Sequence, residues 1–255
     1  QIAALSAGNL ASLADTQIAA LTTTQIGALS VTQVGGLNAG NVGALTNAQI
    51  GALNATQVGA LSTTAVSAFD AGQFAQLNAT QVKALTATQV GAMNATDIGD
   101  ITTTQIAALT ATQVTTLTAT NVGHLSETQI ATFSTAQVQA LTTGNVRAMA
   151  DTQIAALTDT QVANLTATQV AALTSTNVSA LTTGQAAALT ATQLSLLTAA
   201  NVHALADTQV AAMNATQIKA FTATQIAALD ATDMAEFAAT QVAAMTTTQV
   251  GALSN

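Results

Sequence analysis

The side chains with the clearest potential for chemistry are two pairs of carboxylates, each spaced three residues apart. The pairs are Asp97 with Asp100 and Asp233 with Glu236. Hard cations prefer several oxygen ligands, so each pair is a candidate for a weak cation site. Two carboxylates without further ligands are a weak signal, and both Asp97 and Asp233 occupy a position that is usually glutamine in this chain. We therefore favour tolerated substitutions over metal ligation and predict no metal site.

The two histidines, His124 and His203, are the other candidates for acid–base or metal chemistry. They are far apart in the chain, and a repeat array separates such residues further in space, so we expect both to face solvent. The sequence contains no phosphate-binding loop, dinucleotide fingerprint, Ser-His-Asp set or metalloprotease motif. It therefore predicts a protein that is not an enzyme, with no cofactor and no catalytic residues.

Composition narrows the range of partners. Only 5% of the residues are charged, Lys and Arg total three, and the net charge is −8. Such a chain lacks the basic surface that nucleic-acid binding requires. It has no cysteine, which excludes disulfides and thiolate metal sites. Thr, Gln or Asn interrupts every apolar run well short of the roughly 18 residues of a membrane helix, so we predict no membrane span.

The elements that position these side chains follow an eight-residue repeat. With Leu5 as position 1, the frame holds without insertion or deletion to Leu253 and contains 31 complete octads of consensus L-T-x-T-Q-V-x-A. Positions 1 and 6 are apolar in every octad, which predicts a shared core along one uninterrupted array over residues 1–255. The expected core residues include Leu165, Val170, Leu173, Phe69 and Phe74.

Polar residues in each octad match the signals of a helix start. Position 2 is Ser, Thr, Asn or Asp in nearly every octad, which is the preferred N-cap set. Position 5 is usually Gln, three residues later, and completes a capping box; Thr166 and Gln169 are one such pair. Positions 1 and 6 then form a hydrophobic staple. The pattern predicts one short helix per octad.

Substitutions at the N-cap position support this interpretation. Position 2 is Ala in four octads, and in three of them the next residue is acidic. We expect these carboxylates to replace the missing cap. They are Asp15, Asp151 and Asp207.

Helices of two turns are too short to be stable alone, so they must stack. We therefore predict an all-α solenoid of very short helices. The alternative is a β-solenoid with two octads per coil, because Thr favours strands and stacked Gln side chains can form amide ladders. In period and low charge, though not in motif, the chain resembles bacterial ice-nucleation repeats. Against that alternative, positions 1 and 6 are an odd number of residues apart and cannot share one face of a strand.

The unbroken register favours a structural or interaction protein. Because the chain begins and ends within an octad, we expect a segment of a long repetitive protein, or a filament subunit, that associates with itself end to end or laterally. Its acidic, Lys-poor, Thr- and Ala-rich composition resembles the stalk regions of large bacterial adhesins, which implies an extracellular or cell-surface location. The alternatives are a repetitive face that binds ice or polysaccharide and a scaffold that binds peptides.

Overall fold

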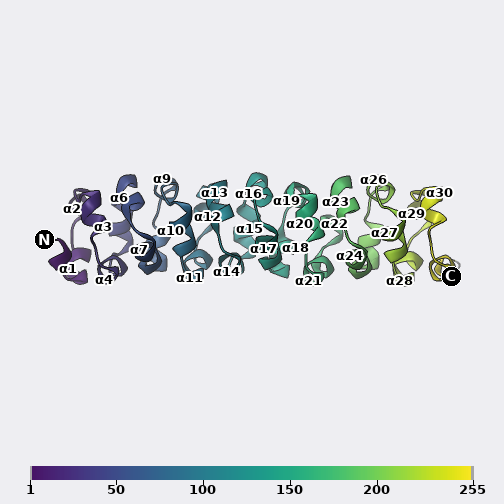
Figure 1. The fold of residues 1–255 in the computed structure, drawn as a ribbon, viewed down its shortest axis with the longest axis horizontal. Helices are drawn as coiled ribbons and strands as arrows, with labels where there is room; N and C mark the ends of the chain where they lie inside the picture. Colours follow the sequence, from purple (N-terminus) through teal and green to yellow (C-terminus); the bar gives the residue numbers. More distant parts are fainter. Residues whose placement is uncertain (1, 254–255) are drawn as a thin grey trace. The chain divides into compact units, whose positions relative to one another are not determined.

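The computed structural model describes residues 2–253, and this range contains 31 short α-helices, one 3-10 helix and no strand. The chain divides into two compact units, Gln1–Thr132 and Phe133–Asn255. Figure 1 shows the helices following one another, joined by brief extended segments. The predicted all-α solenoid with one helix per octad is confirmed, and the β-solenoid alternative is wrong for the described residues.

The helices of the first unit have four to six residues each, after a single 3-10 turn. They are η1 (Ile2–Ala4), α1 (Ala7–Ala11), α2 (Asp15–Ala19), α3 (Thr23–Gly27), α4 (Val31–Gly35), α5 (Ala39–Gly43), α6 (Asn47–Ala52), α7 (Ala55–Ala60), α8 (Thr63–Val66), α9 (Ala71–Phe74), α10 (Ala79–Ala84), α11 (Ala87–Gly91), α12 (Ala95–Asp100), α13 (Thr103–Ala108), α14 (Ala111–Val114), α15 (Ala119–His124) and α16 (Glu127–Ala131).

The second unit continues the same pattern of lengths. Its helices are α17 (Thr135–Ala140), α18 (Thr143–Ala148), α19 (Asp151–Ala156), α20 (Asp159–Ala163), α21 (Ala167–Ala172), α22 (Ser175–Ser179), α23 (Thr183–Ala188), α24 (Ala191–Leu196), α25 (Ala199–His203), α26 (Asp207–Ala211), α27 (Ala215–Ala220), α28 (Ala223–Ala227), α29 (Ala231–Ala235), α30 (Ala239–Val242) and α31 (Thr247–Ala252).

The helices are short because the residues at positions 1 and 2 interrupt each one. Leu173 at position 1 is extended, with φ −56° and ψ 135°, and the next residue, the N-cap Thr174, is also extended, with φ −83° and ψ 163°. Two successive extended residues turn the chain before the next helix can begin. Each octad therefore ends one helix and caps the next.

Stacking within each unit joins helices that are three apart in the chain. The helix α7 packs against α10 in the first unit, and α20 packs against α23 in the second. Side-chain hydrogen bonds also run from Gln49 to the carbonyl oxygens of Ile18 and Leu21, which lie 31 and 28 residues earlier. One superhelical turn therefore takes between three and four octads. Positions 1 and 6 of successive turns share the core of the unit.

Glycine at position 7 permits close approach rather than an unusual backbone conformation. No described glycine has a positive φ. A Cβ added to Gly59 would lie 2.8 Å from the carbonyl oxygen of Ala84 in the next turn, closer than real Cβ atoms approach. Gly99 at the same repeat position has no atom within 4 Å of such a Cβ. The requirement for glycine is therefore local to some turns.

No helix among residues 2–253 is long and apolar enough to cross a membrane.

Candidate functional site

One octad of the second unit shows how each repeat is held. The Oγ1 of Thr166 accepts a hydrogen bond from the N–H of Gln169 at 3.3 Å, and the N–H of Thr166 donates to Gln169 Oε1 at 2.8 Å. Val170 is fully buried, and Leu165 and Leu173 are buried with only a small exposed fraction. These five residues therefore occupy the cap and core of α21.

The core of the first unit contains one aromatic pair. Phe69 and Phe74, at positions 1 and 6 of one octad, are both buried. Their ring centroids are 5.2 Å apart and the rings meet edge to face at 83°. This geometry is favourable for aromatic pairs because the positive edge of one ring meets the negative face of the other.

The glutamine at position 5 has a second role that the repeat pattern alone does not reveal. Gln169 is 1% exposed. Its Nε2 donates to the carbonyl oxygens of Val138 and Leu141 in the previous turn, both at 2.7 Å. The same side chain caps its own helix through Oε1. Each such glutamine therefore joins two turns, and a shorter Asn at this position, such as Asn201, reaches only the position-1 carbonyl, at 2.8 Å.

We call this set of turn-to-turn bonds from position 5 the glutamine ladder. Other members that bind carbonyl oxygens 28 and 31 residues earlier are Gln33, Gln49, Gln57, Gln73, Gln89, Gln105, Gln113, Gln185, Gln193, Gln209, Gln217, Gln225, Gln241 and Gln249.

The aspartates that follow an alanine N-cap lie in the first turn of α2, α19 and α26; they are Asp15, Asp151 and Asp207. The alanine supplies no capping side chain, and its N–H still donates to the position-5 glutamine, as Ala14 does to Gln17 Oε1 at 2.9 Å. A negative charge in the first turn interacts favourably with the helix dipole, so the three carboxylates support the helices at these positions.

Asp97 and Asp233 take the glutamine position and keep only half of its contacts. Each Oδ2 accepts the N–H of its N-cap residue at 2.8 Å. A carboxylate has no N–H to donate to the previous turn. Within the described part of the chain, no donor reaches the position-1 carbonyl oxygens of Phe69 and Leu205, which lie 28 residues before the two aspartates. Both sites therefore lack a rung of the glutamine ladder.

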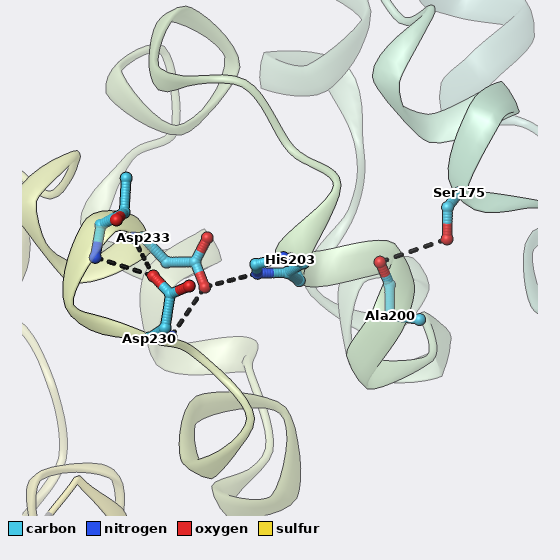
Figure 2. Close-up of polar contacts among 6 residues, drawn as sticks. Ser175, Ala200, His203, Asp230 and Asp233 are labelled. Carbon is cyan, nitrogen blue, oxygen red and sulfur yellow. Dashed lines mark hydrogen bonds and ion pairs between the residues drawn. The ribbon is translucent and has the colours of Figure 1, made fainter.

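At Asp233 the previous turn provides a histidine. His203 Nδ1 lies 2.7 Å from Asp233 Oδ2, and Asp230 is on the adjoining N-cap (Figure 2). The Oδ1 of Asp230 accepts the N–H groups of Thr232 at 2.7 Å and of Asp233 at 3.0 Å. One ligand atom from each of His203, Asp230 and Asp233 lies within 4.8 Å of the other two, a spacing compatible with a metal ion. We call these three residues the His203 cluster.

Two further carboxylates bring negative charge close to this cluster. The hydrogen bond to Asp233, and then its charge, raise the pKa of His203. The pKa of Asp230 is lowered because it accepts backbone hydrogen bonds, that of Asp233 first. Partial burial, together with the hydrogen bond and charge of Asp207, raises the pKa of Glu236 to about 7. Three carboxylates, those of Asp230, Asp233 and Glu236, therefore act on one imidazole, and Asp207 interacts with Glu236.

Asp97 has different surroundings in the first unit. Burial raises its pKa, and the charge of Asp100 raises it further, whereas hydrogen bonds from Asn94 and Ser67 act in the opposite direction. Asn94 stands where the second unit has Asp230, and Ser67 is 30 residues before Asp97, as His203 is before Asp233. This octad therefore has neither the imidazole nor the second carboxylate at the N-cap.

The structure changes the sequence interpretation of His203. Its side chain is 56% exposed, as expected for a position facing solvent, but it is hydrogen-bonded to a carboxylate that is 8% exposed. His124 is exposed, and its Nδ1 lies 2.8 Å from the carbonyl oxygen of Thr120 in its own helix. The two histidines differ in the sequence because His203 is followed 30 residues later by an aspartate, Asp233. This spacing indicates a contact only when the number of octads per superhelical turn is known.

The fold and the repeating contacts define a class, the tandem-repeat proteins with a helical solenoid architecture. The family profile of the ALTTAQ repeat matches residues 130–167, so this segment of the chain is similar to that family. No curated protein matches the sequence.

Proposed function

We propose that the chain is a structural element: a stalk, spacer or fibre segment of a long repetitive protein at the cell surface. The glutamine ladder is the observation that carries the proposal. Two core residues are supplied by every octad, and most octads also supply an N-cap side chain and the amide that joins them to the previous turn. Each turn therefore forms the same contacts with the next one. Arrays of this kind gain stability from contacts between neighbouring repeats, so repeats can be added or removed while the contacts between the remaining ones stay the same.

The surface chemistry supports a role in contacts with other copies. Outside the core and cap positions, the octads present mainly Ala, Gly and Thr, and only 5% of the residues in the chain are charged. Small side chains permit close approach between backbones, and few charges must lose water when two arrays meet. We propose that copies associate laterally or end to end on this basis.

An ice- or polysaccharide-binding face has less support. Such a face needs regular rows of outward-facing hydroxyl groups, but the position-2 hydroxyls are used inside the chain. Thr166 Oγ1, for example, accepts the N–H of Gln169 at 3.3 Å. The threonines at position 2 therefore have an internal role as helix caps.

The length proposal is testable by duplicating residues 165–220, which adds seven octads and about two turns. Stacked helices are about 8–10 Å apart, so two turns add roughly 20 Å to the maximum dimension measured by small-angle X-ray scattering. An insertion of four residues at the same place is the matched control, because it breaks the register and is expected to lower helicity. An unchanged maximum dimension in the seven-octad variant would contradict the proposal.

The location proposal needs a separate experiment on the producing cells. Proteinase K added to intact cells is expected to degrade the protein while a cytoplasmic marker stays intact. Full protection of the protein under these conditions would overturn the cell-surface assignment. Sedimentation velocity at increasing concentration tests self-association: a concentration-dependent rise in the sedimentation coefficient supports it, and a constant monomer value contradicts it.

A further inference from the structure

We propose that the His203 cluster is a binding site for a divalent transition-metal ion of the zinc type. Its ligands are the imidazole of His203 and the carboxylates of Asp230 and Asp233. The inference is independent of the structural role proposed above, because it rests on side chains that differ from the consensus octad.

The donor set fits this class of ion. Zinc binds imidazole nitrogen and carboxylate oxygen at about 2.0–2.2 Å, commonly with three protein ligands and one water. Ligands at those distances are about 3–4 Å from one another in a tetrahedral site. The ligand atoms of the cluster lie within 4.8 Å of one another, and His203 Nδ1 lies 2.7 Å from Asp233 Oδ2, so the exposed His203 side chain would move slightly away from Asp233 to admit the ion. Imidazole favours zinc over calcium or magnesium, which prefer oxygen ligands alone.

Backbone N–H groups at the start of α29 already position the carboxylates of Asp230 and Asp233. Asp230 Oδ1 accepts two N–H groups at the start of α29, and Asp233 Oδ2 accepts the N–H of Asp230 at 2.8 Å. Asp233 is also buried, with 8% of its side chain exposed. The ligands therefore need little ordering when an ion binds, which favours affinity.

The surroundings of the cluster contain more acceptors and negative charges than donors. A consensus glutamine at position 5 would donate to the carbonyl oxygen of Leu205, whereas Asp233 leaves that oxygen without a donor among the described residues. In the same part of the chain, the only ion pair is that of His203 with Asp233. The carboxylates of Asp230 and Asp233 thus share one imidazole, with Glu236 close by, and a divalent cation would offset their repulsion. Its binding would replace the proton between His203 Nδ1 and Asp233 Oδ2 and release that proton to solvent.

The first unit provides the matched comparison within the same chain. Asp97 also replaces a glutamine at position 5 and is also buried, but Ser67 and Asn94 take the places of the histidine and of the second aspartate. If excess acceptors alone attracted an ion, both sites would bind one. The proposal assigns binding to the second site only.

The test is a calorimetric titration of Zn²⁺ into the chelator-treated full chain, with three variants. We expect one ion per chain for the wild type, no measurable binding for Asp233→Gln, and at least tenfold weaker binding for His203→Ala. Asp97→Gln is the control and is expected to bind like the wild type. Because Asp233→Gln restores the consensus residue, it is expected to stay folded, and a circular dichroism spectrum checks this.

Three results would overturn the proposal. They are the absence of Zn²⁺ binding by the wild type, an equal loss in Asp97→Gln and Asp233→Gln, and unchanged affinity in His203→Ala. A competition with millimolar Ca²⁺ tests the class of ion. Retention of Zn²⁺ supports a transition-metal site, and its displacement contradicts the assignment.

Discussion

Asp97 and Asp233 stand at the same position of the repeat in different units, yet they have different neighbours. Both are buried and both accept the N–H of their own N-cap residue at 2.8 Å. The turn before Asp97 presents Ser67, whereas the turn before Asp233 presents His203 at 2.7 Å. A carboxylate at position 5 therefore preserves the helix cap in both places, and the previous turn decides what else it can do.

This difference separates the two tasks of the position-5 side chain. The Oε1 of a glutamine serves its own helix, and its Nε2 serves the previous turn. An aspartate performs the first task and fails the second, which leaves a carbonyl oxygen without its donor. An aspartate stands at this position at two places in the chain, and only at Asp233 does the previous turn present a histidine.

The largest effect is expected when an ordinary rung is converted to a carboxylate. Gln169→Glu keeps the cap but removes both bonds to the previous turn and buries a charge, so we expect a loss of about 3 kcal/mol or more in the free energy of unfolding. Urea denaturation followed by circular dichroism measures it. The control is Gln76→Glu at an exposed site. Equal losses of unfolding free energy in the two variants would contradict a stabilising role of the glutamine ladder.

Restoring the rung in the first unit should have the opposite sign. Asp97→Gln is expected to add about 1–3 kcal/mol to the free energy of unfolding, because it supplies two hydrogen bonds and removes a buried carboxylate. The pKa of Asp97 is raised by burial, so the folded state binds this proton more tightly than the unfolded state. The gain should therefore shrink as the pH falls through the folded pKa. A variant less stable than the wild type at neutral pH would contradict the ladder.

Transplanting the ligands sharpens the comparison in the direction of binding. Ser67→His combined with Asn94→Asp places the residues of the second site around Asp97. We expect the double variant to bind Zn²⁺ at least tenfold more tightly at this site than the wild type does, which corresponds to about 1.4 kcal/mol. Calorimetry in the Asp233→Gln background isolates the new site. No gain in affinity would show that the three side chains are insufficient.

The smallest effect concerns the carboxylate pair beside the His203 cluster. Glu236 has a pKa raised to about 7, well above its ordinary value near 4.5, so protonation stabilises the folded state. In chelator, the stability of the wild type should fall as the pH rises from about 4.5 to about 7 and then level off. Glu236→Gln should lack this decline, by no more than about 1 kcal/mol because solvent screens the pair. An identical pH profile for both proteins would exclude the interaction with Asp207.

The sequence predicts the local structure well because each octad contains its own signals. Thr166, Gln169 and Val170 lie within one helix, so cap, box and core can be recognised without knowledge of the tertiary fold. The contacts between turns cannot be predicted in this way. The pairing of Gln169 with Leu141, and of Asp233 with His203, depends on a turn of between three and four octads, which side-chain packing sets.

The same reason explains why the candidate site differs from the expected one. Spacing within an octad suggests Asp233 with Glu236, whereas the structure joins Asp233 to a residue 30 positions earlier. Asp207, which the sequence suggests as a substitute cap, lies in the first turn of α26 and also interacts with Glu236. Local patterns identified the unusual residues, and the superhelical register determined their partners.

The glutamine ladder is tested most directly by the hydrogen exchange of side-chain amides, followed by nuclear magnetic resonance. Gln169 Nε2 donates to two buried carbonyl oxygens, whereas the exposed Gln76 donates only to Gly72 in its own turn at 3.3 Å. We predict that the Nε2 protons of Gln169 exchange at least about 100-fold more slowly than those of Gln76, because they exchange only when the turns separate. Equal exchange rates for the two side chains would contradict the account.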